Sequence, residues 1–121
     1  PLLYSCSGCS SAAQRANHLA VQPDRMGIAE MSCIAAVGGN VKNLIRAALS
    51  GRNIIAIDGC PLACSRACLD NHNVFPDLNF ELTAFGVSKR KHEDFDRKKA
   101  NEVSVLIRKK IFQQTQAGGL K

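Results

Sequence analysis

The hydrophobic positions of this chain alternate between short apolar runs and longer stripes with helical spacing. The run from Asn53 to Asp58 is continuous and lies between Gly51 and Gly59, which is typical of a strand buried on both faces. Shorter runs predict further strands. The four predicted strands cover residues 2–5, 28–33, 53–58 and 78–82.

Four helices are predicted between and after these strands, because apolar residues recur there at intervals of three and four. Capping residues and proline or glycine positions set their limits. The first follows a cap at Ser10 or Ser11 and ends within 23–27, and the second starts at Val41, capped by Asn40. The third opens at Pro61 and runs to about Leu69. The last begins at Asp94 or Asp96, with an inward stripe of Val103, Leu106, Ile107 and Ile111.

This alternation of strand and helix predicts an α/β fold in which helices cover both faces of a mostly parallel sheet. We expect a three-layer sandwich of the flavodoxin or Rossmann type, with about four strands. The length of 121 residues suits one hydrophobic core, so residues 1–116 are predicted to form a single domain. Residues 117–121 are predicted to be a flexible tail.

Composition predicts the cellular location of this domain and the role of its cysteines. No apolar run reaches 18 residues, which excludes a transmembrane helix. The first residues lack the basic start and apolar stretch of a signal peptide, so a cytoplasmic location is predicted. In a reducing compartment, clustered cysteines indicate metal binding or redox chemistry rather than disulfides. The chain contains six: Cys6, Cys9, Cys33, Cys60, Cys64 and Cys68.

The cysteines fall where the predicted strands end. Cys6 and Cys9 follow the first strand, Cys33 ends the second, and Cys60 follows the third. The carboxyl ends of parallel strands share one edge of a sheet, where α/β proteins place their sites. We therefore expect these cysteines to converge. The start of a helix also favours thiolates, which are the form that binds metals.

Spacing selects four of the six cysteines as metal ligands. Cys6 and Cys9 form a Cys-x-x-Cys pair, and Cys60 and Cys64 are one helical turn apart. Cys68 would lie about 12 Å from Cys60 along a helix axis, too far to share one ion. The first-choice ligands are thus Cys6, Cys9, Cys60 and Cys64, with Cys33 and Cys68 as second choices. Four thiolates form a zinc site, and six thiols would also serve a two-metal site or an iron–sulfur cluster.

Several motifs together resemble one family of small prokaryotic proteins. They are Tyr4-Ser5-Cys6-Ser7-Gly8-Cys9, Glu30-Met31-Ser32-Cys33, Asp58-Gly59-Cys60-Pro61-Leu62 and Phe85-Gly86-Val87 with Lys89-Arg90-Lys91. In this combination the chain resembles the DGC-domain zinc-binding proteins, from about residue 4 to residue 95. The resemblance implies zinc chelation by cysteines, for which Cys6, Cys9, Cys60 and Cys64 are the carriers. It implies no reaction.

The same residues are also compatible with other functions. A dithiol of Cys6 and Cys9 between a strand and a helix also suits thiol–disulfide exchange or sulfur transfer. Cys9 and Arg15 have the spacing of an oxyanion-binding phosphatase loop, but Ser-Ser-Ala-Ala-Gln between them lacks the glycines such a loop needs. No carboxylate or histidine is placed as a general base, so the sequence assigns no reaction.

The basic residues cluster in one segment. The net charge is +6, and residues 89–110 hold nine Lys or Arg against four acidic residues. Only two phenylalanines, Phe95 and Phe112, interleave with these charges, so a stacking surface for bases has little support and nucleic acid is a disfavoured partner. The predicted partners are a metal ion and an unidentified protein or small molecule, with no membrane involved.

Overall fold

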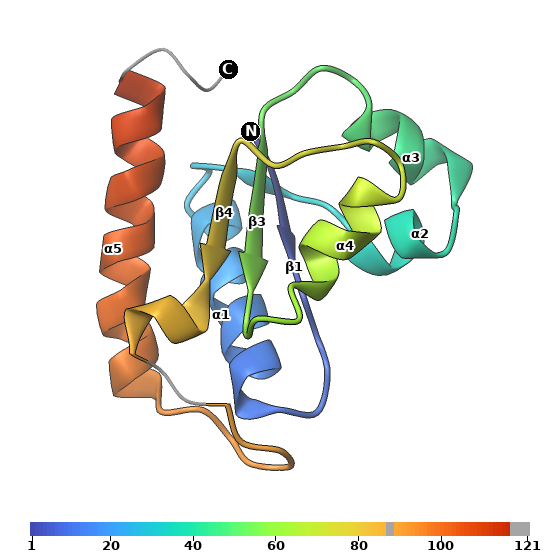
Figure 1. Cartoon of the computed structure of the whole chain (residues 1–121). Helices are drawn as coiled ribbons and strands as arrows, with labels where there is room; N and C mark the ends of the chain where they lie inside the picture. The colour runs from blue at the N-terminus through green and yellow to red at the C-terminus, as the bar shows by residue number, and fades with distance from the viewer. Residues whose placement is uncertain (87–88, 117–121) are drawn as a thin grey trace.

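A computed structural model of the chain describes residues 1–86 and 89–116. Its centre is a four-stranded sheet of order β2-β1-β3-β4 in which every pairing is parallel (Figure 1). The strands are β1 (Leu2–Ser5), β2 (Glu30–Met31), β3 (Ile54–Asp58) and β4 (Leu78–Glu81). The α/β class and the parallel sheet are confirmed, whereas the predicted tail, 117–121, lies outside the described residues.

Helices cover both faces of the sheet, which makes three layers (Figure 1). The helices are α1 (Ser11–Arg25), α2 (Ile34–Gly38), α3 (Lys42–Ala48), α4 (Cys64–Asp70), η1 (Leu82–Phe85) and α5 (Arg97–Gln116). The apolar sides of α1 and α5 share one core, and α2, α3 and α4 contribute to the other. None of the helices in the described ranges is long and apolar enough to cross a membrane.

Alternation along the strands divides side chains between the two cores. Leu3 and Ile55 pack with α1 and α5, whereas Leu2 and Ile54, their neighbours in sequence, pack on the opposite face. All five residues of β3 are buried, as its continuous apolar run predicts. The burial of both faces explains why β3 lies inside the sheet and not at its edge.

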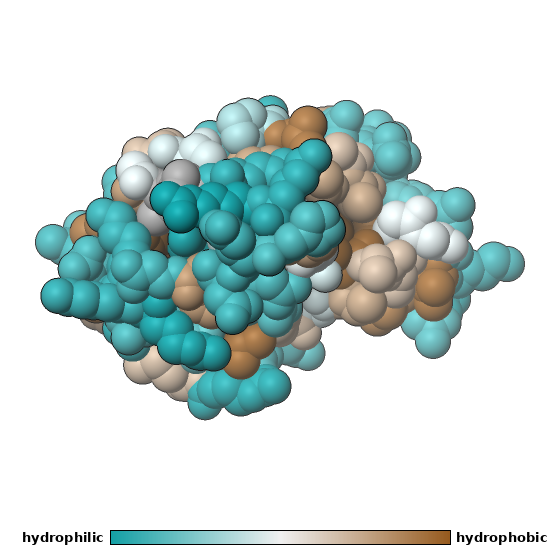
Figure 2. Space-filling model, turned by 90° about the horizontal axis from the view of Figure 1, so that it is seen from below, coloured by the Kyte–Doolittle hydropathy of each residue, from teal (hydrophilic) through white to brown (hydrophobic). Residues whose placement is uncertain are grey.

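The strand order places a topological switch point between β1 and β3. From β1 the chain crosses to β2 on one side, and from β3 it crosses to β4 on the other. The loops that follow β1 and β3 therefore leave the sheet in opposite directions and open a crevice at the carboxyl edge. The strand arrows in Figure 1 point to this edge, which Figure 2 shows from below as a mostly hydrophilic face with smaller hydrophobic areas.

The second predicted strand is much shorter than expected. Only Glu30 and Met31 pair with β1, although the apolar pattern predicts a strand over 28–33. Residues 34–38 then form the short helix α2, which the apolar pattern does not predict. A helix of five residues contains little more than one turn, so it is too short to reveal a helical period.

The predicted N-caps are found at two of the four predicted helices. Ser10 accepts a hydrogen bond from the Ala13 N–H at 3.1 Å, and Asp96 accepts one from the Lys98 N–H at 2.9 Å. Asn40, in contrast, does not cap α3, because its φ of +64° is left-handed and Val41 occupies the cap position. In α5 the inward stripe is confirmed except at Leu106, which is exposed.

Candidate functional site

The four first-choice cysteines line one cavity at the carboxyl edge of the sheet. The cavity has a volume of about 210 Å³ and lies where the loops after β1 and β3 meet the start of α1. Cys6 is buried, Cys60 is half-buried, and Cys9 and Cys64 are exposed. Sequence-distant thiols are thus brought together at the predicted place.

Cys6 is the most firmly held of these thiols. Its backbone N–H donates to the Ile57 carbonyl at 3.1 Å, and its Sγ accepts a hydrogen bond from the Gly59 N–H at 3.1 Å. Burial raises the pKa of the Cys6 thiol from 9.0 to about 11, and the Gly59 hydrogen bond opposes this only in part. Nearby Asp58, Cys64 and Cys60 add to the increase. In the metal-free protein Cys6 is therefore a thiol at neutral pH.

Gly59 sits where the end of β3 touches the first turn of α1. A Cβ at this position would lie 2.5 Å from both the carbonyl carbon and the oxygen of Ala12. These are backbone atoms, which cannot rotate away from the contact. Only glycine allows the approach, and this approach brings the Gly59 N–H to the Cys6 sulfur.

Asp58 anchors the loop that carries Cys60. Its side chain is fully buried and accepts hydrogen bonds from the Ser65 N–H at 2.8 Å and the Ser65 hydroxyl at 2.7 Å. The Arg66 N–H and the Asn79 side-chain amide also donate to it, each at 3.3 Å. Asp58 thus satisfies backbone N–H groups that follow the strand.

The route from Cys60 to Cys64 differs from the prediction. Helix α4 begins at Cys64 and not at Pro61, and residues 60–63 form a turn closed by a 3.0 Å hydrogen bond from the Ala63 N–H to the Cys60 carbonyl. Ala63 precedes the helix with a left-handed φ of +50°. The prediction that Cys60 and Cys64 share one helical turn is therefore wrong, although both line the cavity.

A segment distant in sequence forms the outer wall of the cavity. Residues 89–92 run antiparallel to residues 9–11, with an isolated bridge between Ser10 and Lys91 and a 3.2 Å hydrogen bond from the His92 N–H to the Cys9 carbonyl. Lys89 and Lys91 line the cavity, and Lys89 Nζ lies 3.5 Å from Cys60 Sγ. From the sequence, these lysines were interpreted only as part of a charged segment.

The two second-choice cysteines lie away from this cavity. Cys33 is exposed at the start of α2 and lines a separate depression beside β2. Cys68 is half-buried in α4, where its Sγ lies 3.1 Å from the position that a Cβ on Gly38 would take. Cys33 does not join the others because the chain has left the sheet after Met31 and turned into α2.

The donor set of the cavity suits a thiophilic metal such as zinc. Its four cysteines, without a histidine or carboxylate among them, form an all-thiolate set of the kind that binds zinc tetrahedrally. Within residues 1–86 and 89–116, no three Cys, His, Asp or Glu side chains stand close enough to hold an ion as they are. Binding would therefore draw the sulfurs together, through the loops at 6–10 and 59–63, which contain no helix and no strand longer than an isolated bridge.

Arg15 lies apart from the cysteine cavity. Cys9 lines that cavity, whereas Arg15 lines a second one, on the other side of the start of α1. The phosphatase-type loop of Cys9 and Arg15 is therefore not formed. The second cavity was not predicted from the sequence, since its walls come from the start of α1 and from segments near the start of α5.

Fold and cavity define a small α/β protein of the flavodoxin type whose switch-point crevice is lined by cysteines. The DGC domain matches residues 2–107, and the chain belongs to this family. It is 51% identical over 107 residues to the anaerobic and virulence modulator AnvM of Pseudomonas aeruginosa, covering 88% of this chain and 82% of that protein. No solved structure matches the chain significantly.

Proposed function

We propose that this protein binds one zinc ion through Cys6, Cys9, Cys60 and Cys64, in a centre that serves regulation rather than catalysis. The observation that carries the proposal is the convergence of these four thiols on one cavity at the switch point of the sheet. The convergence is specific, since Cys33 and Cys68 do not line the same cavity.

Charge balance supports a metal with four thiolate ligands. Zn²⁺ with four thiolates carries a net charge of −2, which neighbouring cations stabilise. Lys89 and Lys91 line the cavity and supply two positive charges at this place. The surroundings of the cysteines are also ordered, because Gly59 donates to Cys6 and Asp58 fixes the loop that carries Cys60.

The same ligand set argues against hydrolysis. Four protein ligands fill a tetrahedral zinc ion and leave no position for an activated water. The centre would instead hold the loops after β1 and β3 in one arrangement and release them when the metal leaves. A regulatory role agrees with the name of the related AnvM, which is called a modulator.

Metal analysis of single variants tests this assignment. The purified chain should contain about one equivalent of zinc, and Cys6→Ser, Cys9→Ser, Cys60→Ser and Cys64→Ser should each lose most of it. The matched controls are Cys33→Ser and Cys68→Ser, which remove a thiol outside the cavity and should keep the metal. Cobalt substitution then reports the ligands, because thiolate coordination produces intense charge-transfer absorption.

Other results would replace the proposal. A metal-free protein with a reversible disulfide between Cys6 and Cys9 would favour thiol–disulfide chemistry. Brown protein with visible absorption and bound iron would indicate an iron–sulfur cluster. Equal loss of zinc in the Cys33 variant would assign that residue to the centre and refute the ligand set.

A further inference from the structure

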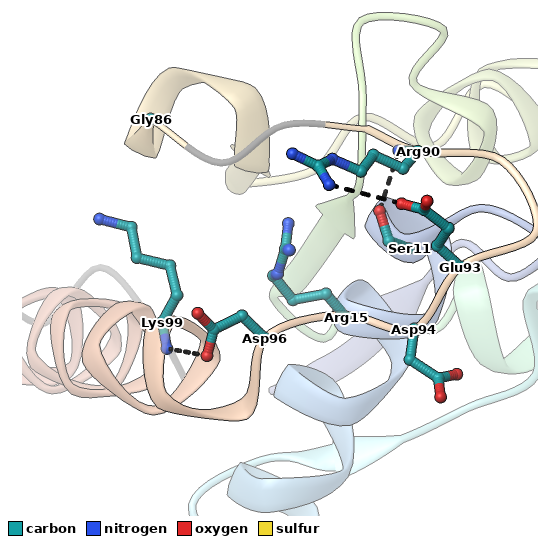
Figure 3. Close-up of a pocket in the computed structure, with 8 residues that line it drawn as sticks. All are labelled: Ser11, Arg15, Gly86, Arg90, Glu93, Asp94, Asp96 and Lys99. Carbon is teal, nitrogen blue, oxygen red and sulfur yellow. Dashed lines mark hydrogen bonds and ion pairs between the residues drawn. The ribbon is translucent and has the colours of Figure 1, made fainter.

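The second cavity of this edge surrounds a buried arginine. Its volume is about 370 Å³, within the range of small-molecule sites. It is lined by Ser11, Arg15, Gly86, Arg90, Glu93, Asp94, Asp96 and Lys99 (Figure 3). No thiol lines it, so its chemistry does not depend on the metal centre.

Arg15 is 4% exposed, although it carries a charge. Its Nε and Nη1 atoms are buried and have no hydrogen-bond partner in the part of the chain that the structure describes. A buried ionised group without a partner is strongly unfavourable, so buried arginines are nearly always paired. Burial lowers the pKa of Arg15, and the charge of Asp96 opposes this decrease without accepting a hydrogen bond from Nε or Nη1.

None of the neighbouring carboxylates accepts a hydrogen bond from Nε or Nη1 of Arg15 in the described ranges. Asp96 caps α5, where it accepts hydrogen bonds from the Lys98 and Lys99 N–H groups at 2.9 and 3.3 Å. Glu93 forms an ion pair with Arg90 at 3.6 Å. In Figure 3 the side chain of Asp94 points away from Arg15, whose guanidinium group extends toward the space between Arg90 and Lys99.

The surrounding groups favour an anion at this place. Arg90 and Lys99 add two cationic side chains to the wall, and the start of α1, a helix of 15 residues, lies beside Arg15 with its positive end. A guanidinium group presents parallel N–H donors that match the oxygens of a carboxylate or a phosphate. Water would satisfy the donors, but Asp96, whose side chain also caps α5, would then be the carboxylate left to offset the buried charge.

We propose that this cavity binds a small molecule through an oxyanion group, a carboxylate or a phosphate, which accepts hydrogen bonds from Arg15. Arg90 and Lys99 flank the anion, and the remaining volume accommodates the body of the ligand. The two anion types share the same recognition chemistry at Arg15, and they are distinguished by titration with each.

The test uses the full chain, labelled with ¹⁵N, and amide spectra recorded at constant ionic strength. Sodium phosphate and sodium acetate are the probes, and sodium chloride supplies the reference for unspecific salt effects. We expect saturable shifts of amides in residues 11–15 and 89–99 with one or both oxyanions, and none with chloride. Stronger binding of phosphate than of acetate would assign a phosphorylated ligand, and the reverse order a carboxylate.

Arg15→Gln should weaken oxyanion binding about ten- to a hundred-fold, the effect of losing a charged hydrogen-bonding partner. Arg66→Gln is the matched control, because Arg66 is an exposed arginine of α4 outside the cavity. If Arg15→Gln does not fold, the double variant Arg90→Gln with Lys99→Gln keeps the buried guanidinium and should still weaken binding. Absence of saturable shifts with both oxyanions, or unchanged affinity in the variants that fold, would overturn the proposal.

Discussion

The cysteine cavity and the arginine cavity lie on two sides of the same helix start, yet they offer different chemistry. Ser10 and Ala13 of the α1 region line the first, whereas Ser11 and Arg15 line the second. Residues 89–91 divide in the same way, with Lys89 and Lys91 facing the thiols and Arg90 facing the other cavity. One edge of a small sheet thus supports two sites, because neighbouring residues of a loop and of a helix start point to opposite sides.

The two cavities also differ in the contacts that hold them together. The cysteine cavity depends on Gly59 and Asp58, which fasten the end of β3 to α1 and α4. The arginine cavity depends on α5 and on the segment before it. Substitutions should therefore affect the cavities unequally, with the largest losses of stability at the end of β3.

Gly59→Ala should have the largest effect, since its Cβ would meet the Ala12 backbone at 2.5 Å. We expect a loss of about 3 kcal/mol in the free energy of unfolding, measured with urea. Ala12→Gly should not rescue it, because the clash is with backbone atoms. Ala63→Gly in the same loop relieves a left-handed φ and should leave stability within about 1 kcal/mol of the wild type. Unchanged stability of Gly59→Ala would refute the close approach.

Asp58→Asn should come next, with a loss of about 2 kcal/mol, because an amide cannot accept all the hydrogen bonds that this buried carboxylate receives. The loss should be accompanied by faster amide exchange in α4, while the amides of α5 keep their protection. Asp70→Asn, an exposed acid at the end of α4, is the control. Equal effects of the two substitutions would contradict the anchoring role of Asp58.

Ser11→Ala should affect the wall that the two cavities share. The Ser11 hydroxyl accepts a 2.9 Å hydrogen bond from the Arg90 N–H, and its loss should reduce stability by about 1 kcal/mol. Amide exchange should accelerate at residues 89–92, since only the backbone hydrogen bonds from Ser11 to the Arg90 carbonyl and from His92 to the Cys9 carbonyl would then join the two segments within the described residues. Ser7→Ala, an exposed serine of the cysteine cavity, should change neither quantity.

The smallest effect concerns the reactivity of Cys6 in the metal-free protein. With a pKa of about 11, its thiolate population at neutral pH is very small, so alkylation should be slow and should accelerate as the pH rises toward 11. Because burial raises this pKa above the ordinary 9.0, the folded protein holds the Cys6 proton more tightly than the unfolded chain does. The free energy of unfolding is therefore unaffected by Cys6 below pH 9 and decreases as the pH rises through 11. Mass spectrometry after timed alkylation measures the reactivity. Modification of Cys6 as fast as exposed Cys9 would contradict its burial.

Local patterns in the sequence predicted the buried parts of the fold well. β3 was evident because both of its faces are buried, which leaves an unbroken apolar run. The cap was predicted to within one residue, at Ser10 or Ser11, because the hydrogen bond between Ser10 and Ala13 is local. The length of β2 was overestimated and α2 was not predicted. Elements of two and five residues are too short to show the period of a strand or a helix.

The cysteine cavity was predictable, and the arginine cavity was not. Parallel topology alone places Cys6 and Cys60 at one edge, so strand order is enough to bring them together. The burial of Arg15 depends instead on the approach of Arg90 and the start of α5, which no local pattern reveals. The helix start at Cys64 also escaped prediction, because it follows an alanine in a left-handed conformation.

The pairing of residues 89–91 with residues 10–11 has a consequence for both sites. Side chains of an extended segment alternate between its two faces, so a shift of one residue reverses every one of them. Deletion of a single residue there would turn an arginine toward the thiols and lysines toward Arg15. The length of this segment therefore sets which cation each site receives.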